Sequence, residues 1–382
     1  MTTWAAAHAL ASSEPRPRPA RLVPLCAAGG LVTAAEVRAV LPVPAFDSAA
    51  MDGYAVAGPG PWAVTGRRLA GSAAGCSLAG GTAVEIATGA LLPAGCDAVL
   101  PYEDCERHGD TVSAPPPARD HIRRAGEDVR PGDPLLPGGR ALTAVAVAAL
   151  AQAGVGEVLA HPAPALTTLV TGDEVVHRDA PGPLGPGQVR DAFSGVIAAL
   201  AARAGAAPPA HRHVRDDPGA LAAAIGAAGG DVVAVTGASS RGAADHLRAV
   251  LDWLGARWLV DGVACRPGHP QGLAALPDGR WVVSLPGNPF AGLVAALTLL
   301  EPLLARLAGR PAAPARTAPV HGEAKPFPAG TRIVPVALAG GRAVVVPGAR
   351  PAGLRAAAAA DALAVLDATW RSGGDGLLLA LP

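Results

Sequence analysis

The sequence predicts a multidomain α/β plus β protein built around a doubly wound sheet, in which helices cover both faces of mainly parallel strands. Its 382 residues, at about 150 per domain, suggest two to four domains. Within residues 164–308, apolar runs of four to six residues alternate with amphipathic stretches of 11 to 19. Within residues 46–141, short β-type runs alternate with Gly, Pro and Asp turns, which is typical of a β-rich domain.

A discontinuous N-terminal domain is expected from residues 1–45 together with 142–163. Apolar clusters in residues 3–40 flank the Pro-rich stretch EPRPRPARLVPL, which predicts two short helices joined by a crossing. The pattern LTAVAVAALAQAG after position 141 is helical, and Gly154 is a plausible helix end. Residues 46–141, between the two segments, form the predicted β-rich domain.

The doubly wound domain is expected over residues 164–308. Its strands are predicted at Leu166–Val170, Val232–Thr236, Trp258–Ala264 and Trp281–Leu285. Its helices are predicted at 191–204, 218–228, 243–254 and 289–307. Residues 314–382 then predict a small C-terminal β domain, with two strands joined by an AGGR turn within Arg332–Val346, an Ala-rich stretch at 354–363 and a further strand.

Composition excludes several classes of protein. Lys+Arg and Asp+Glu both number 31, so the broad basic field that drives nucleic-acid binding is absent. Lys325 is the one lysine among the basic residues. The five cysteines form no CxxC pair, which favours a reducing compartment over a zinc site or a disulfide framework. No secretory signal is evident, and the longest apolar stretches, Ala141–Ala151 and Phe290–Leu300, are shorter than a membrane span. We expect a cytoplasmic protein that binds neither nucleic acid nor membrane.

Three loops of the doubly wound domain are candidates for ligand binding, because ligands bind where the strands of such a sheet end. These are TGDE (171–174), GASSRG (237–242) and PGNP (286–289). The second has the composition of a phosphate cradle, although its glycines would equally suit a tight turn. It lacks the GK[ST] ending of a nucleotide P-loop, and no GxGxxG follows a strand.

Charged residues accompany these loops. The turn RPGHP (266–270) would hold a guanidinium and an imidazole outward, an arrangement that suits anion binding. The alternative is that both side chains are simply solvated at the surface. The carboxylates of TGDE suit Mg²⁺ or a helix cap. Two segments of the β-rich domain, AAMDGYAV (49–56) and TGALLP (88–93), show only an ordinary hairpin turn and a loop.

Taken in order, these segments resemble one family, the molybdopterin molybdenumtransferases of molybdenum cofactor biosynthesis. The resemblance covers nearly the whole chain and rests on nine motifs. They are AAMDGYAV (49–56), ATGALLPAGCDAVLPYED (87–104), IRRAGEDVRPGD (122–133), TGDE (171–174), GQVRD (187–191), RDDP (215–218), TGASSRGAAD (236–245), RPGHP (266–270) and LPGNP (285–289).

The resemblance implies a transferase that inserts molybdate into adenylylated molybdopterin with Mg²⁺ and releases AMP. It implies an elongated homodimer with a discontinuous N-terminal domain, and a transient contact with the adenylyltransferase of the pathway. It implies catalytic roles for Asp52, Thr88, Glu174, Asp231 and Asp245, with Asp52 and Glu174 as metal ligands. The implied substrate-binding residues are Gly237, Ser240, Arg241, Gly242, Arg266, Gly268, His269, Pro286, Gly287, Asn288 and Pro289. A partner subunit could supply the DGYA segment.

Several positions depart from the family pattern. Where the family reads roughly KPGKP, the chain has Arg266 and His269, and a histidine near neutral pH is mostly uncharged. Ala243 and Ala291 replace an expected acid and an expected hydroxyl, while Arg241 adds a cation. An alternative hypothesis is therefore a catalytically weakened paralogue that carries or senses molybdopterin. A third, an adenylyltransferase using the sheet domain alone, would leave the DGYA and TGALLP segments without a purpose.

Overall fold

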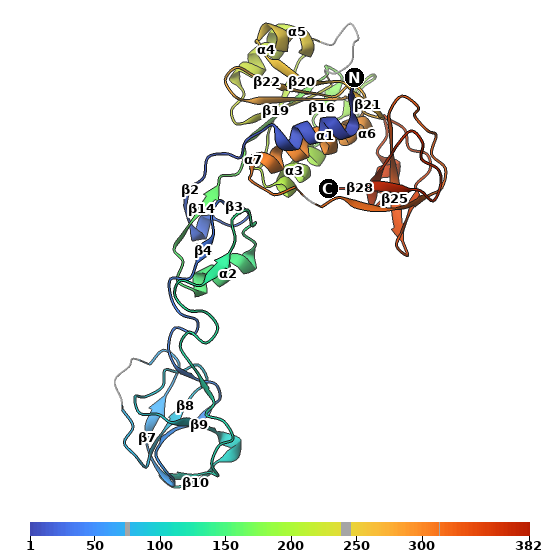
Figure 1. Cartoon of the computed structure of the whole chain (residues 1–382). Helices are drawn as coiled ribbons and strands as arrows, with labels where there is room; N and C mark the ends of the chain where they lie inside the picture. The colour runs from blue at the N-terminus through green and yellow to red at the C-terminus, as the bar shows by residue number, and fades with distance from the viewer. Residues whose placement is uncertain (73–76, 238–245, 313) are drawn as a thin grey trace.

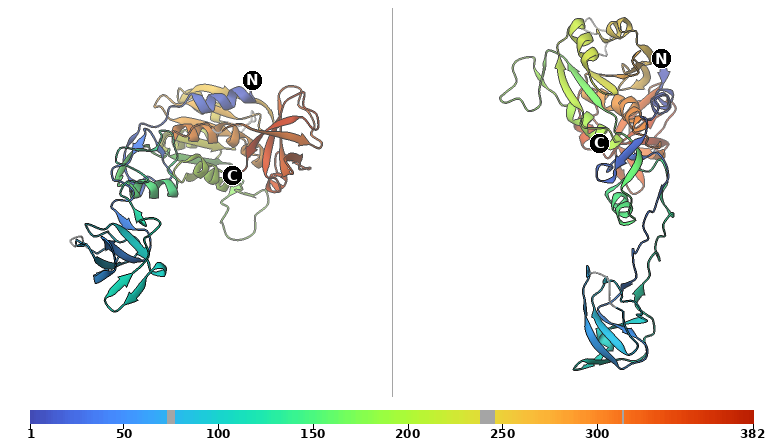
Figure 2. Two further views of the ribbon diagram at one scale, coloured as in Figure 1. Left: turned by 60° about the horizontal axis from the view of Figure 1, so that its bottom comes forward. Right: turned by 90° about the vertical axis from the view of Figure 1, so that its left-hand side faces the viewer.

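The computed structural model describes residues 1–72, 77–237, 246–312 and 314–382. The molecule is elongated, with the doubly wound sheet and the C-terminal domain at one end and the β-rich domain at the other (Figure 1). The discontinuous domain lies between them and is connected to each by two chain segments (Figure 2). The predicted fold class, a multidomain α/β plus β protein, is confirmed.

The doubly wound sheet has the strand order β18-β15-β19-β23-β22-β20. Its first four strands are parallel, whereas β22 runs antiparallel to both of its neighbours. Its strands are β15 (Leu166–Thr171), β18 (Ala210–Val214), β19 (Val232–Thr236), β20 (Arg257–Asp261), β22 (Gly272–Ala275) and β23 (Trp281–Leu285). The predicted strand Trp258–Ala264 is wrong, because Gly262, with a φ of 77°, separates β20 from a strand of another sheet.

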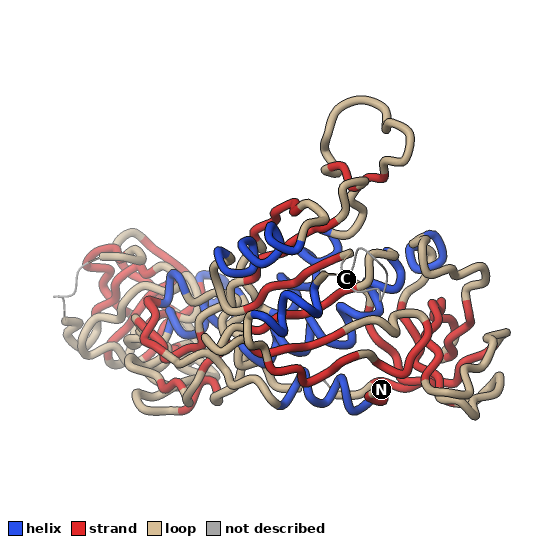
Figure 3. The backbone as a smooth tube through the Cα atoms, turned by 90° about the horizontal axis from the view of Figure 1, so that it is seen from above, coloured by secondary structure: helices blue, strands red, loops and turns tan. Residues whose placement is uncertain are grey.

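Helices cover both faces of this sheet (Figure 3). The first hydrophobic core contains residues of α1, α3, α6, η3 and α7, and the second contains residues of α4 and α5. These helices are α1 (Trp4–Ser13), α3 (Ser194–Ala204), α4 (Pro218–Ala227), α5 (Leu247–Trp253), α6 (Pro289–Ala295), the π-helical η3 (Ala296–Leu300) and α7 (Glu301–Leu307). A loop held at its base by β16 (Val175–Val176) and β17 (Val189–Arg190) protrudes from the sheet domain (Figure 3).

Helices α6, η3 and α7 form one continuous stretch, Pro289–Leu307, with a mean hydropathy of 1.7. Its 19 residues would suffice by length and composition to cross a membrane, although the uninterrupted apolar run Phe290–Leu300 is too short to do so. However, 78% of its most apolar window is buried. The burial identifies it as a core helix of the sheet domain.

The discontinuous domain contains a three-stranded sheet, a two-stranded sheet and one helix. Its elements are β2 (Arg21–Pro24), η1 (Leu25–Ala27), β3 (Val32–Thr33), β4 (Val37–Arg38), β13 (Pro134–Leu136), α2 (Ala144–Gln152) and β14 (Glu157–His161). The predicted helix before Gly154 is confirmed as α2, whose first turn is capped by the Thr143 hydroxyl.

The N-terminal segment differs from the prediction of two helices in residues 3–40. Only α1 is an α-helix there, and it packs on the sheet domain. The reason is its apolar face, because Trp4, Ala7 and Ala11 are buried against η3 and α7. The Trp4 indole also donates a hydrogen bond to the Thr298 hydroxyl at 2.9 Å.

The β-rich domain is built on a six-stranded sheet of order β10-β11-β7-β8-β6-β9. The elements are β5 (Ser48–Ala49), β6 (Gly53–Ala57), β7 (Trp62–Arg68), β8 (Thr82–Ile86), β9 (Ala98–Pro101), η2 (Tyr102–Asp104), β10 (Glu106–His108), β11 (Thr111–Ser113) and β12 (Ile122–Arg123). Strand β5 pairs with β12 beside this sheet.

The C-terminal domain is a small closed barrel, in which β25-β26-β24-β28-β27 return to β25. Strand β21 pairs with β25 and so joins the barrel to the sheet domain, while β1 pairs with β21. The elements are β1 (Thr2–Thr3), β21 (Val263–Arg266), β24 (Arg316–His321), β25 (Thr331–Ala339), β26 (Arg342–Val345), α8 (Arg355–Ala358), β27 (Ala362–Leu366) and β28 (Asp375–Ala380).

Candidate functional site

Three loops meet at the carboxyl edge of the doubly wound sheet. The strands β15, β19 and β23 are parallel and in register, with Val170 opposite Thr236 and Thr236 opposite Leu285. The loops that follow them therefore leave the sheet on the same side. This arrangement confirms that TGDE, the start of GASSRG, and PGNP are neighbours.

Glycine allows these loops to touch. Gly237 has a φ of 92°, and a Cβ added there would lie 2.7 Å from the Thr171 carbonyl oxygen. A Cβ on Gly287 would lie 3.1 Å from the Gly237 Cα. The Gly237 N–H donates to the Leu285 carbonyl at 3.2 Å. Because side chains are absent at these points, backbone groups of adjacent loops can approach a ligand closely.

The PGNP loop places four predicted residues at the start of α6. Pro286 is buried, Gly287 and Asn288 are exposed, and Pro289 begins the helix. In the turn that follows β15, Glu174 is exposed. No ion pair or hydrogen bond of its carboxylate is found among the described residues. Its carboxylate is thus available to a ligand or an ion.

The RPGHP turn packs beside the PGNP loop. A Cβ on Gly268 would lie 3.4 Å from the Ala291 carbonyl oxygen in α6. The His269 Nδ1–H donates to the Val263 carbonyl at 3.0 Å. The Arg266 guanidinium lies 4.8 Å from the centroid of the Phe327 ring. The turn therefore lies beside the start of α6, with Arg266 on the Phe327 ring and His269 held by its hydrogen bond.

A second arginine, which the sequence did not identify, stands beside Arg266. Strands β21 and β25 pair in parallel with Arg266 opposite Arg332. Burial first, and then the charge of Arg266, lowers the pKa of Arg332. Neither guanidinium forms an ion pair within the part of the chain that the structure describes. Because two adjacent like charges repel each other, this arrangement favours a bound anion.

The barrel also brings Arg350 towards the sheet loops. The carbonyl of Pro351 accepts the N–H groups of Phe290 at 2.9 Å and Ala291 at 3.3 Å, so the residue before it lies close to the start of α6. Neither Arg332 nor Arg350 belongs to a motif that local patterns pick out. Their positions depend on strand pairing between domains, which sequence spacing does not reveal.

At the other end of the molecule, Asp52 and Thr88 form a preorganised pair. The Asp52 Oδ1 accepts the Thr88 backbone N–H at 2.6 Å and the Thr88 hydroxyl at 2.9 Å. These hydrogen bonds hold the pKa of the exposed Asp52 carboxyl below its usual value. The second oxygen, Oδ2, has no hydrogen bond among the described residues. We call this pair the tip of the β-rich domain.

The structure does not bring all the predicted site residues together within one chain. Asp52 precedes β6 and Thr88 follows β8 in the β-rich domain, whereas Glu174 follows β15 in the sheet domain. The two domains lie at opposite ends of the molecule (Figure 1). Within the described ranges, no cluster of three or more His, Cys, Asp or Glu residues could hold a metal ion. One chain alone therefore does not assemble the Mg²⁺ site that Asp52 and Glu174 were predicted to form.

Asp231 is also displaced from the predicted site. It immediately precedes β19 and lies at the amino edge of the sheet, whereas Gly237 lies at the carboxyl edge. At about 3.3 Å per residue, the strand separates the two by about 20 Å. Asp231 instead forms an ion pair with Arg18 at 3.1 Å. The prediction that it lines the site with Gly237 is wrong. The sequence could have shown this, because Asp231 comes before the predicted strand and Gly237 comes after it.

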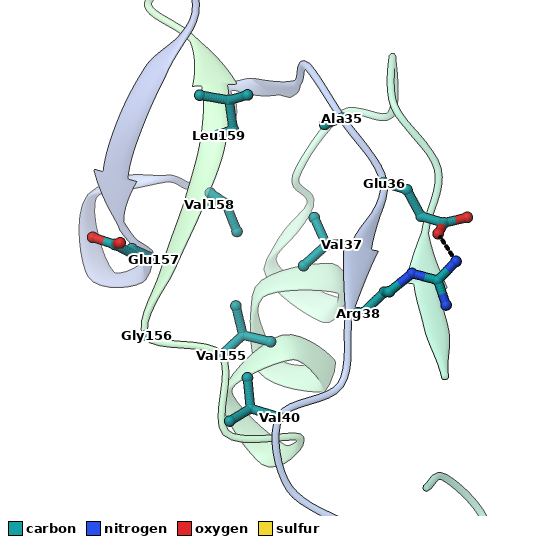
Figure 4. A pocket seen from close by; sticks show the side chains of 10 residues that line it. All are labelled: Ala35, Glu36, Val37, Arg38, Val40, Val155, Gly156, Glu157, Val158 and Leu159. Atoms are coloured by element: carbon teal, nitrogen blue, oxygen red, sulfur yellow. Dashed lines mark ion pairs between the residues drawn. The ribbon is translucent and has the colours of Figure 1, made fainter. Parts of the chain in front are cut away.

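Four predicted residues lie outside the described residues: Ser240, Arg241, Gly242 and Asp245. A separate hollow of about 310 Å³ lies in the discontinuous domain, between β4 and β14 (Figure 4). Glu36 and Arg38 line it and form an ion pair at 2.5 Å (Figure 4). Its arginine is therefore neutralised, unlike Arg266 and Arg332.

Two family models match most of the chain. A family model described as the MoeA N-terminal region (domain I and II) matches residues 2–154, and one described as a probable molybdopterin binding domain matches residues 167–306. A molybdopterin molybdenumtransferase of Synechococcus elongatus is 37% identical over 300 residues, covering 74% of each chain. Another, of Haemophilus influenzae, is 34% identical over 312 residues, covering 78% of this chain and 75% of the relative.

Solved structures agree with the sequence matches. A molybdopterin biosynthesis moeA protein from Pyrococcus horikoshii superposes with a TM-score of 0.79 at 28% identity, covering 100% of this chain and 99% of that one. A second structure from Pyrococcus horikoshii, with a TM-score of 0.74 at 22% identity and full coverage of both chains, shares the fold.

Proposed function

The chain belongs to the molybdopterin molybdenumtransferase family, and from that premise we propose that it inserts molybdate into adenylylated molybdopterin and releases AMP. The observation that carries the proposal is the pair Arg266 and Arg332, adjacent and without a carboxylate partner among the described residues. Molybdate and the adenylylated substrate are both anions, so two unneutralised guanidiniums beside open backbone loops suit them.

We propose that the enzyme works as a homodimer whose site is shared between chains. We use the name sheet crevice for the loops that follow β15, β19 and β23 together with Arg266 and Arg332. The support is the separation of the tip from the sheet crevice within one chain (Figure 1). A symmetric dimer can place the tip of each chain against the crevice of the other. The tip would then bring the Asp52 carboxylate to the loops that carry Glu174 and Gly237.

Mg²⁺ is part of this proposal because the donor set suits it. Asp52 offers Oδ2, which is free of hydrogen bonds among the described residues, and Glu174 offers an exposed carboxylate. Carboxylate oxygens shared with substrate phosphates are typical Mg²⁺ ligands. When bound, the ion would neutralise charge on the transferred groups. Asp52 and Glu174 could hold it together only where two chains meet.

The roles of the chain's own residues follow from their positions. Arg266 and Arg332 would bind the oxyanion, and the loops around Gly237 and Gly287 would let backbone groups contact the phosphates. Thr88 lowers the pKa of the Asp52 carboxyl and fixes its orientation through two hydrogen bonds. We further propose a cytoplasmic location and a transient contact with the adenylyltransferase that supplies the substrate.

The test is a turnover assay combined with complementation. Purified protein given adenylylated molybdopterin, Mg²⁺ and molybdate should release AMP. Assayed at molybdate far below saturation, Asp52→Asn and Arg266→Ala should each release little AMP alone. In dimers remixed from the two variants, half of the dimers would carry one intact site, so about one quarter of the normal activity should return. An inactive mixture, with subunit exchange shown by mass spectrometry, would exclude the shared site.

A further inference from the structure

Two proline-rich segments cross between the sheet domain and the discontinuous domain. Residues 14–20 (EPRPRPA) lead from α1 to β2, and residues 162–165 (PAPA) return from β14 to β15. Neither contains a helix or a strand. These two segments connect the sheet domain to the arm, which consists of the discontinuous domain and the β-rich domain with its tip (Figure 1). The direction of this arm therefore depends on how the two crossings are held.

Arg18 ties the crossings to each other. Its NH1 group donates to the Ala163 carbonyl in the returning segment at 2.6 Å. Its backbone carbonyl accepts the Nδ1–H of His161 at 2.6 Å, and its backbone N–H donates to the Leu307 carbonyl at 2.9 Å. One residue thus links the outgoing segment, the returning segment and the end of α7.

Asp231 fastens this junction to the sheet. Its Oδ1 lies 3.1 Å from the Arg18 Nε, and its Oδ2 accepts the Ala165 N–H at 2.7 Å. The Arg18 and Asp231 side chains are 34% and 26% exposed, so solvent screens this ion pair less than one on the open surface. A single carboxylate therefore holds both crossings against the amino edge of β19.

We propose that the Arg18–Asp231 clamp sets the direction of the arm that carries the tip, and that Asp231 is a positioning residue for the transferase reaction. It acts through the arm and does not touch substrate. The consequence for catalysis rests on the proposed shared site, whereas the geometry of the clamp does not. A role limited to stabilising the sheet domain is the competing explanation.

The structure supplies a matched control for that explanation. Arg203 and Glu301 form an ion pair inside the sheet domain at 2.5 Å, with side chains 32% and 22% exposed. Its burial resembles that of the clamp, but it contacts neither crossing. Glu301→Gln should therefore cost stability without moving the arm, whereas Asp231→Asn should release the arm.

The experiment measures the arm directly. Spin labels are placed at Gly66→Cys in β7 and Gly226→Cys in α4, two positions where an added Cβ meets nothing within 4 Å. The background carries Cys26→Ala, Cys76→Ala, Cys96→Ala and Cys105→Ala and keeps the buried Cys265, and labelled chains are diluted into unlabelled ones. Double electron–electron resonance should give one narrow distance distribution for the parent and for Glu301→Gln. Asp231→Asn and Arg18→Ala should both broaden it, and combining them should broaden it no further.

Activity completes the test. Asp231→Asn should reduce kcat for AMP release at least tenfold with little change in the KM for molybdate, beyond any loss in Glu301→Gln. An unchanged distance distribution in Asp231→Asn would overturn the clamp. A broadened distribution with unchanged kcat would overturn its role in the reaction. A parent protein that releases no AMP would refute the proposed function, while the distance measurement would still decide whether the clamp exists.

Discussion

The two ends of the molecule differ in whether their charged side chains have partners. At the tip, the Asp52 carboxylate has its partner in place, because Thr88 donates two hydrogen bonds to one of its oxygens. In the sheet crevice, Arg266 and Arg332 lie opposite each other without an acidic partner among the described residues. The Asp52 carboxylate at the tip is already oriented by hydrogen bonds. The crevice, in contrast, is a basic surface without a counter-charge. The comparison teaches that the crevice needs an anionic ligand as its counter-charge, whereas the oriented Asp52 carboxylate is open to a cation through its second oxygen.

The largest expected effect tests the tip. Asp52→Asn should lower the rate of AMP release by at least about 10²-fold, because the amide removes the only charge of the tip pair and weakens the proposed metal ligand. The fold should survive, since Asp52 is exposed. The measurement is kcat at saturating molybdate, together with a thermal melt.

Asp97→Asn is the matched control for the tip. Asp97 also accepts a backbone N–H through its carboxylate, from Gly58 at 2.7 Å, in the same domain. Its variant should keep normal turnover. Normal turnover of Asp52→Asn at low molybdate would instead show that the tip takes no part in the reaction.

The next largest effect is on molybdate binding by the two arginines of the crevice. Arg266→Ala and Arg332→Ala should each weaken molybdate binding by about 1.5–3 kcal/mol, the cost of a charged hydrogen bond. Arg332→Gln should in addition leave the free energy of unfolding unchanged or raised, because it removes a like-charge contact. Titration calorimetry with molybdate and chemical denaturation measure the two quantities.

The exposed Arg342 on β26 provides the control for charge alone. Arg342→Ala should change neither binding nor stability by more than about 0.5 kcal/mol. If Arg332→Gln were strongly destabilising and left binding intact, the crevice would be a structural contact and not an anion site.

A third effect concerns the glycines that shape the crevice. Gly237→Ala should destabilise the fold by about 1–3 kcal/mol, because its φ of 92° and the Thr171 oxygen 2.7 Å from the new Cβ both oppose a side chain. Gly226→Ala, within α4 and with nothing within 4 Å, should stabilise by up to about 1 kcal/mol. Thermal melts compare them, and equal melting temperatures would contradict the close approach of the loops.

The sheet loops could be predicted from the sequence, whereas the contacts between domains could not. Apolar runs and turn residues were enough to predict β15, β19 and β23, and parallel strands bring their loops to one edge. The Arg266–Arg332 contact was not predictable, because it depends on β21 joining the strand of another domain. The packing of helix α1 on the sheet domain was not predictable for the same reason. Its burial on α7 is a tertiary contact that periodicity does not specify.

A smaller effect separates the two Thr88 hydrogen bonds. Thr88→Val removes the hydroxyl but keeps the N–H, so the pKa of Asp52 should rise towards its ordinary value. A lowered pKa favours the folded state above the unfolded pKa, and this contribution is lost as pH falls through the folded pKa. Because Asp52 would then take up its proton at a higher pH, the acidic limb of the AMP-release profile should move to higher pH in Thr88→Val. Thr82→Val, whose hydroxyl donates to the Ala79 carbonyl, should leave that limb in place.

The smallest effect concerns His269, where the family pattern has lysine. Its Nδ1–H is already committed to the Val263 carbonyl, so the side chain is held by the turn, and Arg266 and Arg332 supply two permanent cations nearby. A third cation would mainly add repulsion to a crevice that already lacks a counter-charge. His269→Lys should consequently change kcat/KM for molybdate by less than about threefold at pH 8, while losing up to about 1.5 kcal/mol of stability with the hydrogen bond. A tenfold gain in kcat/KM at pH 8 would show that the crevice is short of positive charge and that the arginine pair does not replace the lysines of the family pattern KPGKP.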